Sequence, residues 1–324
     1  MPFLIVGGAL LVLLLGALAV SRWVYCKAFY VPKKQKNADP YAHFGRKKDE
    51  DYRRRLYGLV DMLKEKESEE VFTDSYDGLR LVGHYYHLAD GAPLKIIFHG
   101  WRSTYLRDCG GGAEMAWRAG YNLLLVDQRA LGKSEGHTIT FGIKEKYDCL
   151  SWVNYAIERF GKDVKIILGG VSMGAATVLM ASALDLPSNV KCISADCGYT
   201  SPEAIIRKVC REDMGIPDSL GFPFVRLGAR LFGGFSIMDG GALEAVKHAK
   251  VPLMIMHGDE DDFVPFSMCH ELYEAIPGQK TLLTVAGAGH GLSYFAQTER
   301  YEQTLRAFES AALEQEDGKE RQDG

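Results

Sequence analysis

The sequence predicts an α/β protein built on a mainly parallel, doubly wound sheet, and three observations support this prediction. Predicted strands alternate with predicted helices from about residue 94 onward, a pattern that produces parallel strands joined by crossover helices. A Gly-x-Ser-x-Gly turn, residues 170–174, lies between a strand and a helix in the middle of this pattern. Two later strands run into an acidic loop and into Gly289-His290, at the sheet edge where ligands bind in such folds.

The composition is that of an ordinary globular protein with a large core. The 324 residues are 47 % hydrophobic and 25 % charged, enough for one large α/β domain or two small ones. The net charge of −4 argues against a nucleic-acid partner, which would need a basic face. The seven cysteines are scattered without a Cys-x-x-Cys pair. This argues against a zinc site and a disulfide framework, and favours reduced, buried thiols.

The N-terminal segment is predicted to cross a membrane. Residues 3–20 are all apolar or glycine, and at about 1.5 Å per residue they nearly match a hydrocarbon core of roughly 30 Å. The segment that follows carries basic and aromatic residues typical of a membrane interface: Arg22, Lys27, Lys33, Lys34, Lys36, Trp23, Tyr25 and Tyr30. We therefore expect residues 1–22 to be an uncleaved anchor, with the rest of the chain on the cytoplasmic side, where cysteines stay reduced.

A cleaved signal peptide is the alternative, and it would make the protein secreted or extracellular-facing. Ala17-Leu18-Ala19 fits a small-x-small cleavage site. A signal peptide, however, has a basic start and a shorter apolar core, whereas this chain begins Met-Pro-Phe and stays apolar through residue 20.

Residues 23–70 are predicted to be a basic linker followed by a charged helix. Residues 31–49 are polar, basic and interrupted by proline, as in a juxtamembrane linker. Residues 51–70 are densely charged, but one apolar stripe has helical spacing: Leu56, Leu59, Val60 and Leu63. We expect that helix to pack its apolar face on the domain.

The main domain is predicted to span residues 71–312. Asp77-Gly78 separates two alternating runs within residues 71–88, which predicts a β-hairpin. The expected strands that follow are 94–98, 122–126, 164–168, 190–195, 251–256 and 281–285, and the expected helices are 112–119, 143–160, the segment after residue 174, 266–275 and 294–313. Residues 313–324 form a polar tail.

An insertion interrupts the alternation between Tyr199 and Lys250. Roughly fifty residues separate two strands there, far more than one crossover helix needs. The insertion is rich in large apolar residues: Phe222, Phe224, Val225, Leu227, Leu231, Phe232, Phe235 and Ile237. We expect residues 200–249 to form a cap whose apolar side covers the active site. The alternative is a set of helices packed on the flank of the sheet.

The Gly-x-Ser-x-Gly turn puts a candidate nucleophile, Ser172, at a strand end. A serine hydroxyl needs a histidine to take its proton, and that histidine needs an acid to fix its tautomer. After such a turn, the acid and then the histidine follow along the chain. Here the strand 251–256 runs into residues 257–265, which hold three aspartates, and the strand 281–285 runs into His290. Asp196, at the end of an earlier strand, is a rival acid.

Taken together, these motifs resemble the α/β-hydrolase superfamily over residues 71–312. The matching segments are His99-Gly100, Asp127-Gln-Arg-Ala-Leu-Gly-Lys-Ser134, Gly170-Val-Ser-Met-Gly174, His257-Gly-Asp-Glu-Asp261-Asp-Phe-Val-Pro265 and Gly289-His290. The chain is most similar to the branch of serine aminopeptidases and monoglyceride-lipase-like enzymes. Asp196-Cys-Gly-Tyr-Thr-Ser201 and the N-terminal anchor resemble uncharacterised bacterial membrane-anchored members. Ala130 is a departure, because many relatives have glycine after the arginine.

The resemblance implies a role for each member of the triad. Ser172 is the expected nucleophile and His290 the expected general base. Asp259, Asp261 and Asp262 lie in one loop, and the His-Gly-x-x-Asp spacing of the family selects Asp261 as the acid.

The resemblance also implies an oxyanion hole made of backbone groups. The expected donors are the backbone N–H groups of Trp101, after His99-Gly100, and of Met173, at the start of the helix. His99 itself is expected to support the oxyanion loop, and Asp127 to accept structural hydrogen bonds.

The expected function is a serine hydrolase that cleaves a carboxylic ester through an acyl-enzyme intermediate, without a metal or an organic cofactor. The same triad cleaves other acyl bonds, so a thioesterase and a serine peptidase or aminopeptidase are alternatives. The predicted anchor and the aromatic cap favour an apolar acyl substrate. A catalytically silent, membrane-tethered binding protein is the alternative from another class.

Overall fold

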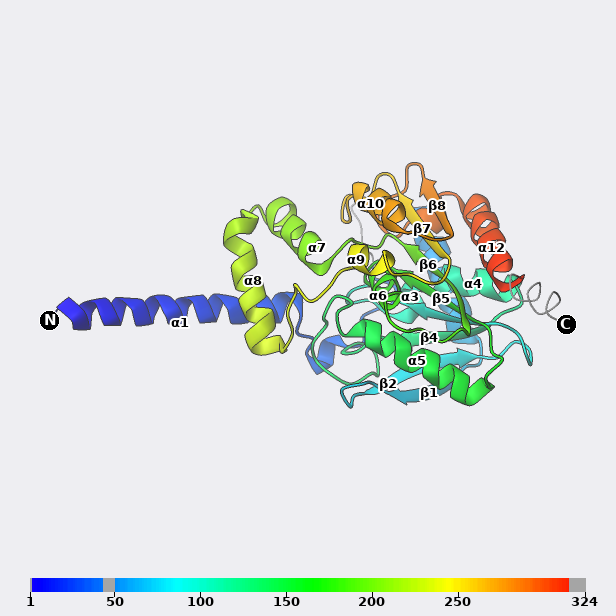
Figure 1. The fold of residues 1–324 in the computed structure, drawn as a ribbon, viewed down its shortest axis with the longest axis horizontal. Helices are drawn as coiled ribbons and strands as arrows, with labels where there is room; N and C mark the ends of the chain where they lie inside the picture. The colour runs from blue at the N-terminus through cyan, green and yellow to red at the C-terminus, as the bar shows by residue number, and fades with distance from the viewer. Residues whose placement is uncertain (1, 43–49, 315–324) are drawn as a thin grey trace.

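A computed structural model describes residues 2–42 and 50–314, and its centre is one eight-stranded sheet (Figure 1). The strands are β1 (Glu69–Asp74), β2 (Arg80–Tyr86), β3 (Leu94–Phe98), β4 (Asn122–Asp127), β5 (Ile166–Val171), β6 (Val190–Asp196), β7 (Leu253–Gly258) and β8 (Lys280–Val285). Their order in the sheet is β1-β2-β4-β3-β5-β6-β7-β8. The pairs β1/β2 and β2/β4 are antiparallel, and every later pair is parallel. The predicted fold class, including the N-terminal hairpin, is confirmed.

Helices cover both faces of this sheet. The helices of the described residues are α1 (Pro2–Ala28), α2 (Glu50–Glu65), α3 (Tyr105–Asp108), α4 (Gly110–Arg118), α5 (Glu145–Phe160), α6 (Met173–Ala181), α7 (Pro202–Lys208), α8 (Asp218–Gly233), α9 (Ala242–Val246), α10 (Ser267–Ala275), α11 (Ser293–Ala296) and α12 (Thr298–Glu314). The core on one face includes residues of α5, α6, α9 and α10, and the core on the other includes residues of α2, α4 and α12. Sheet residues such as Ile96 and Leu168 face the first core, and Ile97 and Ile167 face the second.

Most predicted elements are present within a few residues of their expected bounds. The charged helix α2 buries the predicted stripe of Leu56, Leu59, Val60 and Leu63. In the predicted hairpin, Gly78 has a φ of 83°, a left-handed conformation that favours glycine. The predicted closing helix 294–313 is instead two helices, α11 and α12, because Gln297 leaves the helical conformation between them. Residues 315–324 of the predicted tail lie outside the described residues.

The N-terminal helix extends beyond the predicted anchor, residues 1–22. It continues to Ala28, and its last part is buried in the domain. Tyr25, Phe29 and Val31 belong to the same core as α5 and α6. The Val31 N–H donates to the His137 carbonyl at 2.8 Å. The beginning of the predicted linker is therefore packed structure, while residues 43–49 of that linker are outside the described part of the chain.

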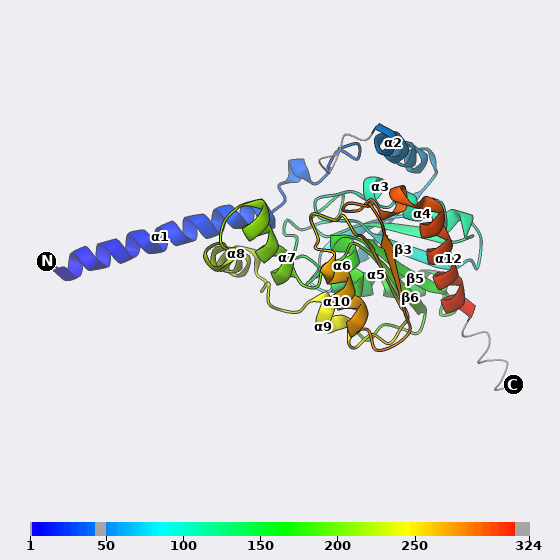
Figure 2. The same ribbon diagram turned by 90° about the horizontal axis from the view of Figure 1, so that it is seen from above.

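The insertion at residues 200–249 contains α7, a short π-helical segment (Val209–Asp213), α8 and α9. Helix α8 packs mainly on α1, and Figure 2 shows the two helices meeting beside the domain. The apolar residues Phe222, Val225 and Ala229 of α8 join the core that also contains Tyr25 and Phe29. The helical insertion is present, and α8 packs on the N-terminal helix, a partner that the sequence prediction did not foresee. A covering role over the active site stays a prediction.

Candidate active site

The predicted nucleophile sits on a tight turn between β5 and α6. Ser172 has φ 56° and ψ −116°, a strained backbone conformation for a residue with a side chain. A Cβ atom on Gly170 would lie 2.3 Å from the backbone of Gly174, and one on Gly174 would lie 2.0 Å from the Phe98 carbonyl oxygen. Both glycines are therefore sterically required, and together they lift Ser172 above the carboxyl edge of the sheet.

The structure brings Ser172, His290 and Asp261 into one hydrogen-bonded row. His290 Nε2 is 2.9 Å from Ser172 Oγ, and His290 Nδ1 is 2.7 Å from Asp261 Oδ2. The other carboxylate oxygen, Asp261 Oδ1, accepts the backbone N–H groups of Phe263 at 2.9 Å and Val264 at 2.8 Å. These distances are those of a nucleophile, a base and a group that orients the base.

The electrostatic surroundings keep Asp261 ionised. Its side chain is fully buried, and burial alone would raise its pKa. Hydrogen bonds and charge from His257 and His290 outweigh burial and hold the pKa of Asp261 well below its usual range. His257 donates from Nε2 to the Val264 carbonyl at 3.0 Å, and the same nitrogen lies 3.2 Å from Asp261 Oδ2. The sequence prediction quoted His257 only as part of a motif and missed this contact with the acid.

Two of the other candidate acids, Asp196 and Asp259, have other hydrogen-bond partners. Asp196 accepts the Ser293 hydroxyl at 3.1 Å and the Tyr301 hydroxyl at 3.0 Å, and burial raises its pKa. Asp259 accepts the Gly287 N–H at 2.7 Å and so joins the loops that carry Asp261 and His290. Among the candidate acids, Asp261 is the one that the structure puts on His290.

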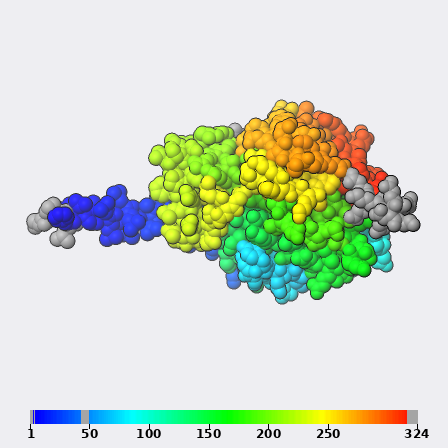
Figure 3. Space-filling model, in the orientation of Figure 1, coloured from blue at the N-terminus to red at the C-terminus, as the bar shows by residue number. Residues whose placement is uncertain are grey.

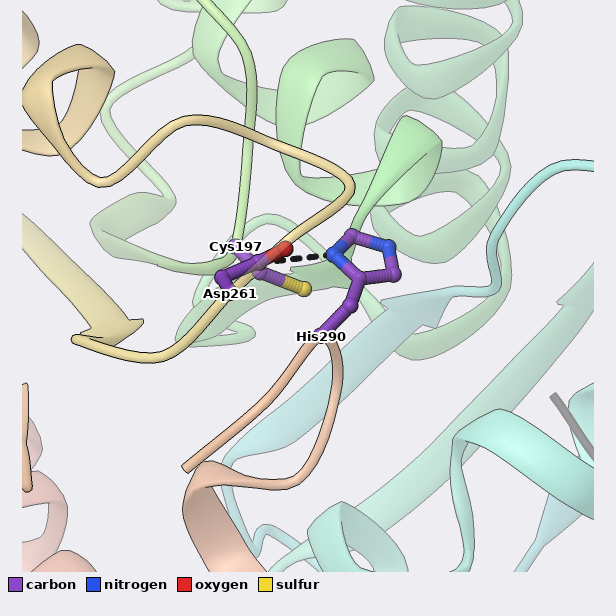
Figure 4. Close-up of side chains that lie close together, drawn as sticks. All are labelled: Cys197, Asp261 and His290. Carbon is purple, nitrogen blue, oxygen red and sulfur yellow. Dashed lines mark hydrogen bonds and ion pairs between the residues drawn. The ribbon is translucent and has the colours of Figure 1, made fainter. Parts of the chain in front are cut away.

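Cys197 lies beside Asp261 and His290, as Figure 4 shows. One ligand atom from each of these residues lies within 4.8 Å of the others, a spacing that a metal ion could bridge. Burial raises the pKa of the Cys197 thiol well above its usual value, and the negative charges of Asp196 and Asp261 raise it further. The hydrogen bond between His290 Nδ1 and Asp261 Oδ2 already joins two of these three side chains, so we interpret Cys197 as a small buried residue packed beside them.

His99 holds the predicted oxyanion loop in place. Its ring is fully buried, Nδ1 donates to the Gly100 carbonyl at 2.9 Å, and Nε2 accepts the Gln128 backbone N–H at 3.2 Å. Burial lowers the pKa of His99, which favours the neutral ring that these two bonds require. Both ring nitrogens serve the loop, in agreement with the predicted supporting role.

The end of α1 is attached to the same loop. Trp101 donates from its indole Nε1 to the Ala28 carbonyl at 3.1 Å, and Arg102 donates to the carbonyls of Lys27 at 3.1 Å and Tyr30 at 2.7 Å. The last carbonyls of a helix have no partner within the helix, so these side chains satisfy them. The conformation of the loop that carries the Trp101 N–H is thus tied to the N-terminal helix.

We expect Trp101→Phe to lower kcat for a soluble ester about threefold to tenfold with little change in KM, because losing one buried hydrogen bond costs about 1 kcal/mol and loosens the loop. Steady-state kinetics on the purified protein measure this split. Trp117→Phe, on α4, is the matched control and should leave kcat unchanged. A Trp101→Phe enzyme with unchanged kcat would contradict the attachment as a positioning device.

The structure also explains two further residues from the segments that resemble the family, Asp127 and Ala130. Asp127 accepts the Lys133 N–H at 2.9 Å, and a Cβ atom on Gly132 would collide with its carboxylate. Ala130 is buried with a φ of 67°, a conformation that costs an alanine more than a glycine. A glycine would adopt this conformation at a lower cost.

Comparison with known proteins supports the fold. A family model described as alpha/beta hydrolase fold matches residues 96–221, the segment from β3 into α8 that includes Ser172. The chain is 24 % identical over 267 residues to the uncharacterized protein YqkD of Bacillus subtilis, covering 81 % of this chain and 87 % of that protein. It is 30 % identical over 158 residues to the thiohydrolase aneE of Aspergillus aculeatus, covering 48 % of this chain and 47 % of that protein.

Solved structures also support the fold. The esterase Pf2001 of Pyrococcus furiosus has a TM-score of 0.61 at 22 % identity, covering 82 % of this chain and 94 % of its own. Est1E of Butyrivibrio proteoclasticus, solved with ferulic acid bound, has a TM-score of 0.58 at 22 % identity, covering 75 % of this chain and 99 % of its own. The predicted resemblance is confirmed for the fold and for distant relatives. Its closer link to aminopeptidases and monoglyceride-lipase-like enzymes stays a prediction.

Proposed function

From the α/β-hydrolase fold of this chain and the row formed by Ser172, His290 and Asp261, we propose that it is a serine hydrolase acting on a carboxylic ester. The observation that carries the proposal is His290, whose two ring nitrogens lie within hydrogen-bond reach of a nucleophile and a buried carboxylate. A ring held in this way can take a proton from Ser172 while Asp261 stabilises the resulting positive charge.

The proposed mechanism has two halves. His290 Nε2 removes the proton from Ser172 Oγ as the oxygen attacks the ester carbonyl, and the oxyanion accepts hydrogen bonds from the backbone N–H groups of Trp101 and Met173. The intermediate collapses, the alcohol leaves with the proton from His290, and an acyl group remains on Ser172. Water then attacks this acyl-enzyme with His290 as base, and collapse releases the carboxylic acid and restores the hydroxyl.

An ester is the favoured bond because solved structures with this fold include the esterases Pf2001 and Est1E. A thioester is the second candidate, favoured by the relative that is named a thiohydrolase. Either substrate is a small acyl compound, and the steps above need neither a metal nor an organic cofactor. A peptide bond stays a third alternative, since the fold alone does not determine the substrate.

We further propose that α1 anchors the enzyme in a membrane with the catalytic domain on the cytoplasmic side. Residues 5–28 of α1 are long and apolar enough to cross a bilayer, and the most apolar window of 18 residues is almost entirely exposed. Basic residues follow the apolar part, which favours a cytoplasmic position for the domain. All seven cysteines are free, as expected in a reducing compartment. Sequencing the mature N-terminus distinguishes this anchor from a signal peptide cleaved after Ala19.

Labelling with a fluorophosphonate probe tests the enzymatic proposal. The activated Ser172 oxygen forms a bond to phosphorus while the phosphorus–fluorine bond breaks, and fluoride leaves. We expect the wild type to be labelled and both Ser172→Ala and His290→Ala to stay unlabelled, with unchanged circular dichroism. Gel fluorescence and intact mass measure the result.

A folded wild type that neither takes up the probe nor cleaves short p-nitrophenyl esters would contradict the proposal. In that case the silent, membrane-tethered binding protein becomes the better explanation. If the probe reacts, the rates with matched ester, thioester and amide substrates then determine the preferred bond.

A further inference from the structure

The insertion helix α8 runs across the N-terminal helix and not along it. Figure 1 shows α8 standing across α1, and Figure 2 shows α8 end-on while α1 is still seen along its length. The crossing is close, because a Cβ atom on Gly228 would lie 2.4 Å from the Ser21 carbonyl oxygen. The rings of Tyr25 and Phe232 lie 6.0 Å apart, and the Arg22 guanidinium lies 5.3 Å from the Phe232 ring. Helix α8 is therefore fixed on α1 at residues 21–25.

The part of α1 before this crossing has the length and the surface of a membrane span. Residues 2–20 form about 28 Å of helix, close to the roughly 30 Å of a hydrocarbon core. Its large side chains are exposed, among them Leu10, Leu13 and Leu15. If this part of α1 spans the bilayer, the crossing at Ser21 lies at the membrane boundary, and α8 lies along the membrane surface.

Helix α8 carries an apolar stripe on its exposed side. Leu220, Leu227 and Leu231 are 63 %, 36 % and 53 % exposed, and the half-buried Phe224 lies between them. At 100° per residue these four positions fall within about 60° of one another, on the face opposite to the core residues Phe222, Val225 and Ala229. Met214 and Ile216, just before the helix, are exposed as well.

The stripe faces the side from which the free part of α1 projects. The core of the domain lies toward the C-terminal end of α1, and the stripe is on the face of α8 opposite to that core. Figure 3 shows the surface of the insertion turned toward the projecting N-terminal helix. Exposed apolar side chains gathered on one face of a helix indicate a binding surface, and the crossing at Ser21 puts this face next to the exposed apolar part of α1.

The residues around the stripe suit a lipid headgroup layer. Arg230 is exposed on the side of α8 next to the stripe, and Arg22 and Lys27 are exposed on α1 near the crossing. Trp23 is exposed at the same level. Basic side chains attract anionic headgroups, and tryptophan prefers the boundary between headgroups and acyl chains.

We propose that α8 is a membrane-contact helix: it lies in the headgroup layer of the bilayer that α1 spans, with Leu220, Phe224, Leu227 and Leu231 in contact with acyl chains. This inference rests on the proposed anchor and adds a second contact to it. The sheet edge that carries Ser172 then faces the membrane, for two reasons. The loop that carries the Trp101 N–H is attached to α1 at the Ala28 carbonyl. Helix α7 contacts the loop that carries Asp261, because Lys208 donates to the Asp262 carbonyl. An ester dissolved in the bilayer would reach Ser172 without crossing bulk water.

Site-specific fluorescence on the full chain tests this orientation. The background variant is Cys26→Ser, because Cys26 is the partly exposed cysteine and the other six are buried. Single cysteines at Leu227→Cys and Leu231→Cys carry an environment-sensitive dye, and Glu271→Cys on the exposed side of α10 is the control. The protein is reconstituted in vesicles of equal parts phosphatidylcholine and phosphatidylglycerol, and the dye is quenched either by spin-labelled lipid or by aqueous iodide.

We expect dyes at positions 227 and 231 to be quenched by the labelled lipid and protected from iodide, and the dye at 271 to behave in the opposite way. Iodide quenching at all three positions in protein that floats with the vesicles would overturn the proposal while leaving the anchor intact. Protein that does not float would overturn both. Fluorophosphonate labelling of the same samples reports on Ser172 independently, so none of these results decides the proposed enzymatic function.

The hydrolysis rate of a double variant of α8 provides a second, independent test. Leu227→Asp combined with Leu231→Asp should reduce hydrolysis of an ester embedded in those vesicles by roughly tenfold or more, since two charges now oppose insertion of α8. Hydrolysis of a short soluble ester should not change, because neither residue contacts the triad. Equal rates of wild type and variant on the embedded ester would overturn the proposal, and the dye experiment tests it even if this variant fails to fold.

Discussion

Replacing Asp261 with asparagine should lower kcat for a soluble ester about 10⁴-fold while leaving the fold intact. Asp261 accepts the proton-bearing Nδ1 of His290 at 2.7 Å, and this bond keeps Nε2 free to take the proton of Ser172. An asparagine amide can offer a donor at the same place, which favours the wrong tautomer of His290 and leaves its positive charge unbalanced. Steady-state kinetics at neutral pH measure the loss.

Asp196→Asn is the matched control, because Asp196 is the rival acid from a different loop. Its oxygens accept the hydroxyls of Ser293 and Tyr301, so the variant should lose stability but change kcat less than about tenfold. A loss of activity as large as that of Asp261→Asn, in a protein that stays folded, would mean that the acid has been assigned to the wrong loop. Because the pKa of Asp261 is lowered, its carboxylate stays ionised above about pH 4. Any loss of activity above that pH must therefore come from another group.

The elements that the sequence predicted correctly are those whose signals are local. The turn around Ser172 is marked by two glycines within five residues, and the collisions of their missing Cβ atoms explain why that signal is reliable. The strands before His290 and before Asp261 are short apolar runs, and parallel pairing brings their carboxyl ends to one edge regardless of the distance along the chain. Local pattern and topology together therefore predict that Ser172, Asp261 and His290 lie at one edge of the sheet.

The features that the sequence prediction missed depend on contacts between distant segments. The Phe29 ring packs edge-on against Phe141 at 5.6 Å and Phe235 at 5.2 Å, partners more than 100 residues away. In the sequence, Tyr25 and Phe29 follow an apolar segment and have the composition of a membrane interface, so their burial in the domain core was not predicted. The second partner of Asp261, His257, was visible as a motif residue, but its contact depends on the folded loop.

Because the end of α1 is packed in the domain, we expect two N-terminal truncations to have very different effects on stability. Removing residues 2–20 should leave a folded domain with unchanged kcat on a soluble ester, because the buried contacts of α1 begin at Ser21. Removing residues 2–31 should lower the free energy of unfolding by at least about 6 kcal/mol, since it deletes the buried side chains of Tyr25, Phe29 and Val31. A typical domain has about 5–15 kcal/mol in total, so we expect this second protein to be unfolded or aggregated.

Urea unfolding followed by circular dichroism, in mild detergent for both proteins, makes the comparison. A stable, active protein without residues 2–31 would contradict the assignment of these residues to the core. The reasoning also bears on the alternative of a cleaved signal peptide. Cleavage after Ala19 would leave Ser21 to Val31 in place, so the domain would keep both its core and the carbonyls that hold Trp101 and Arg102. The structural requirement of the domain therefore begins at about residue 21, and the residues before it remain for the proposed attachment to the membrane.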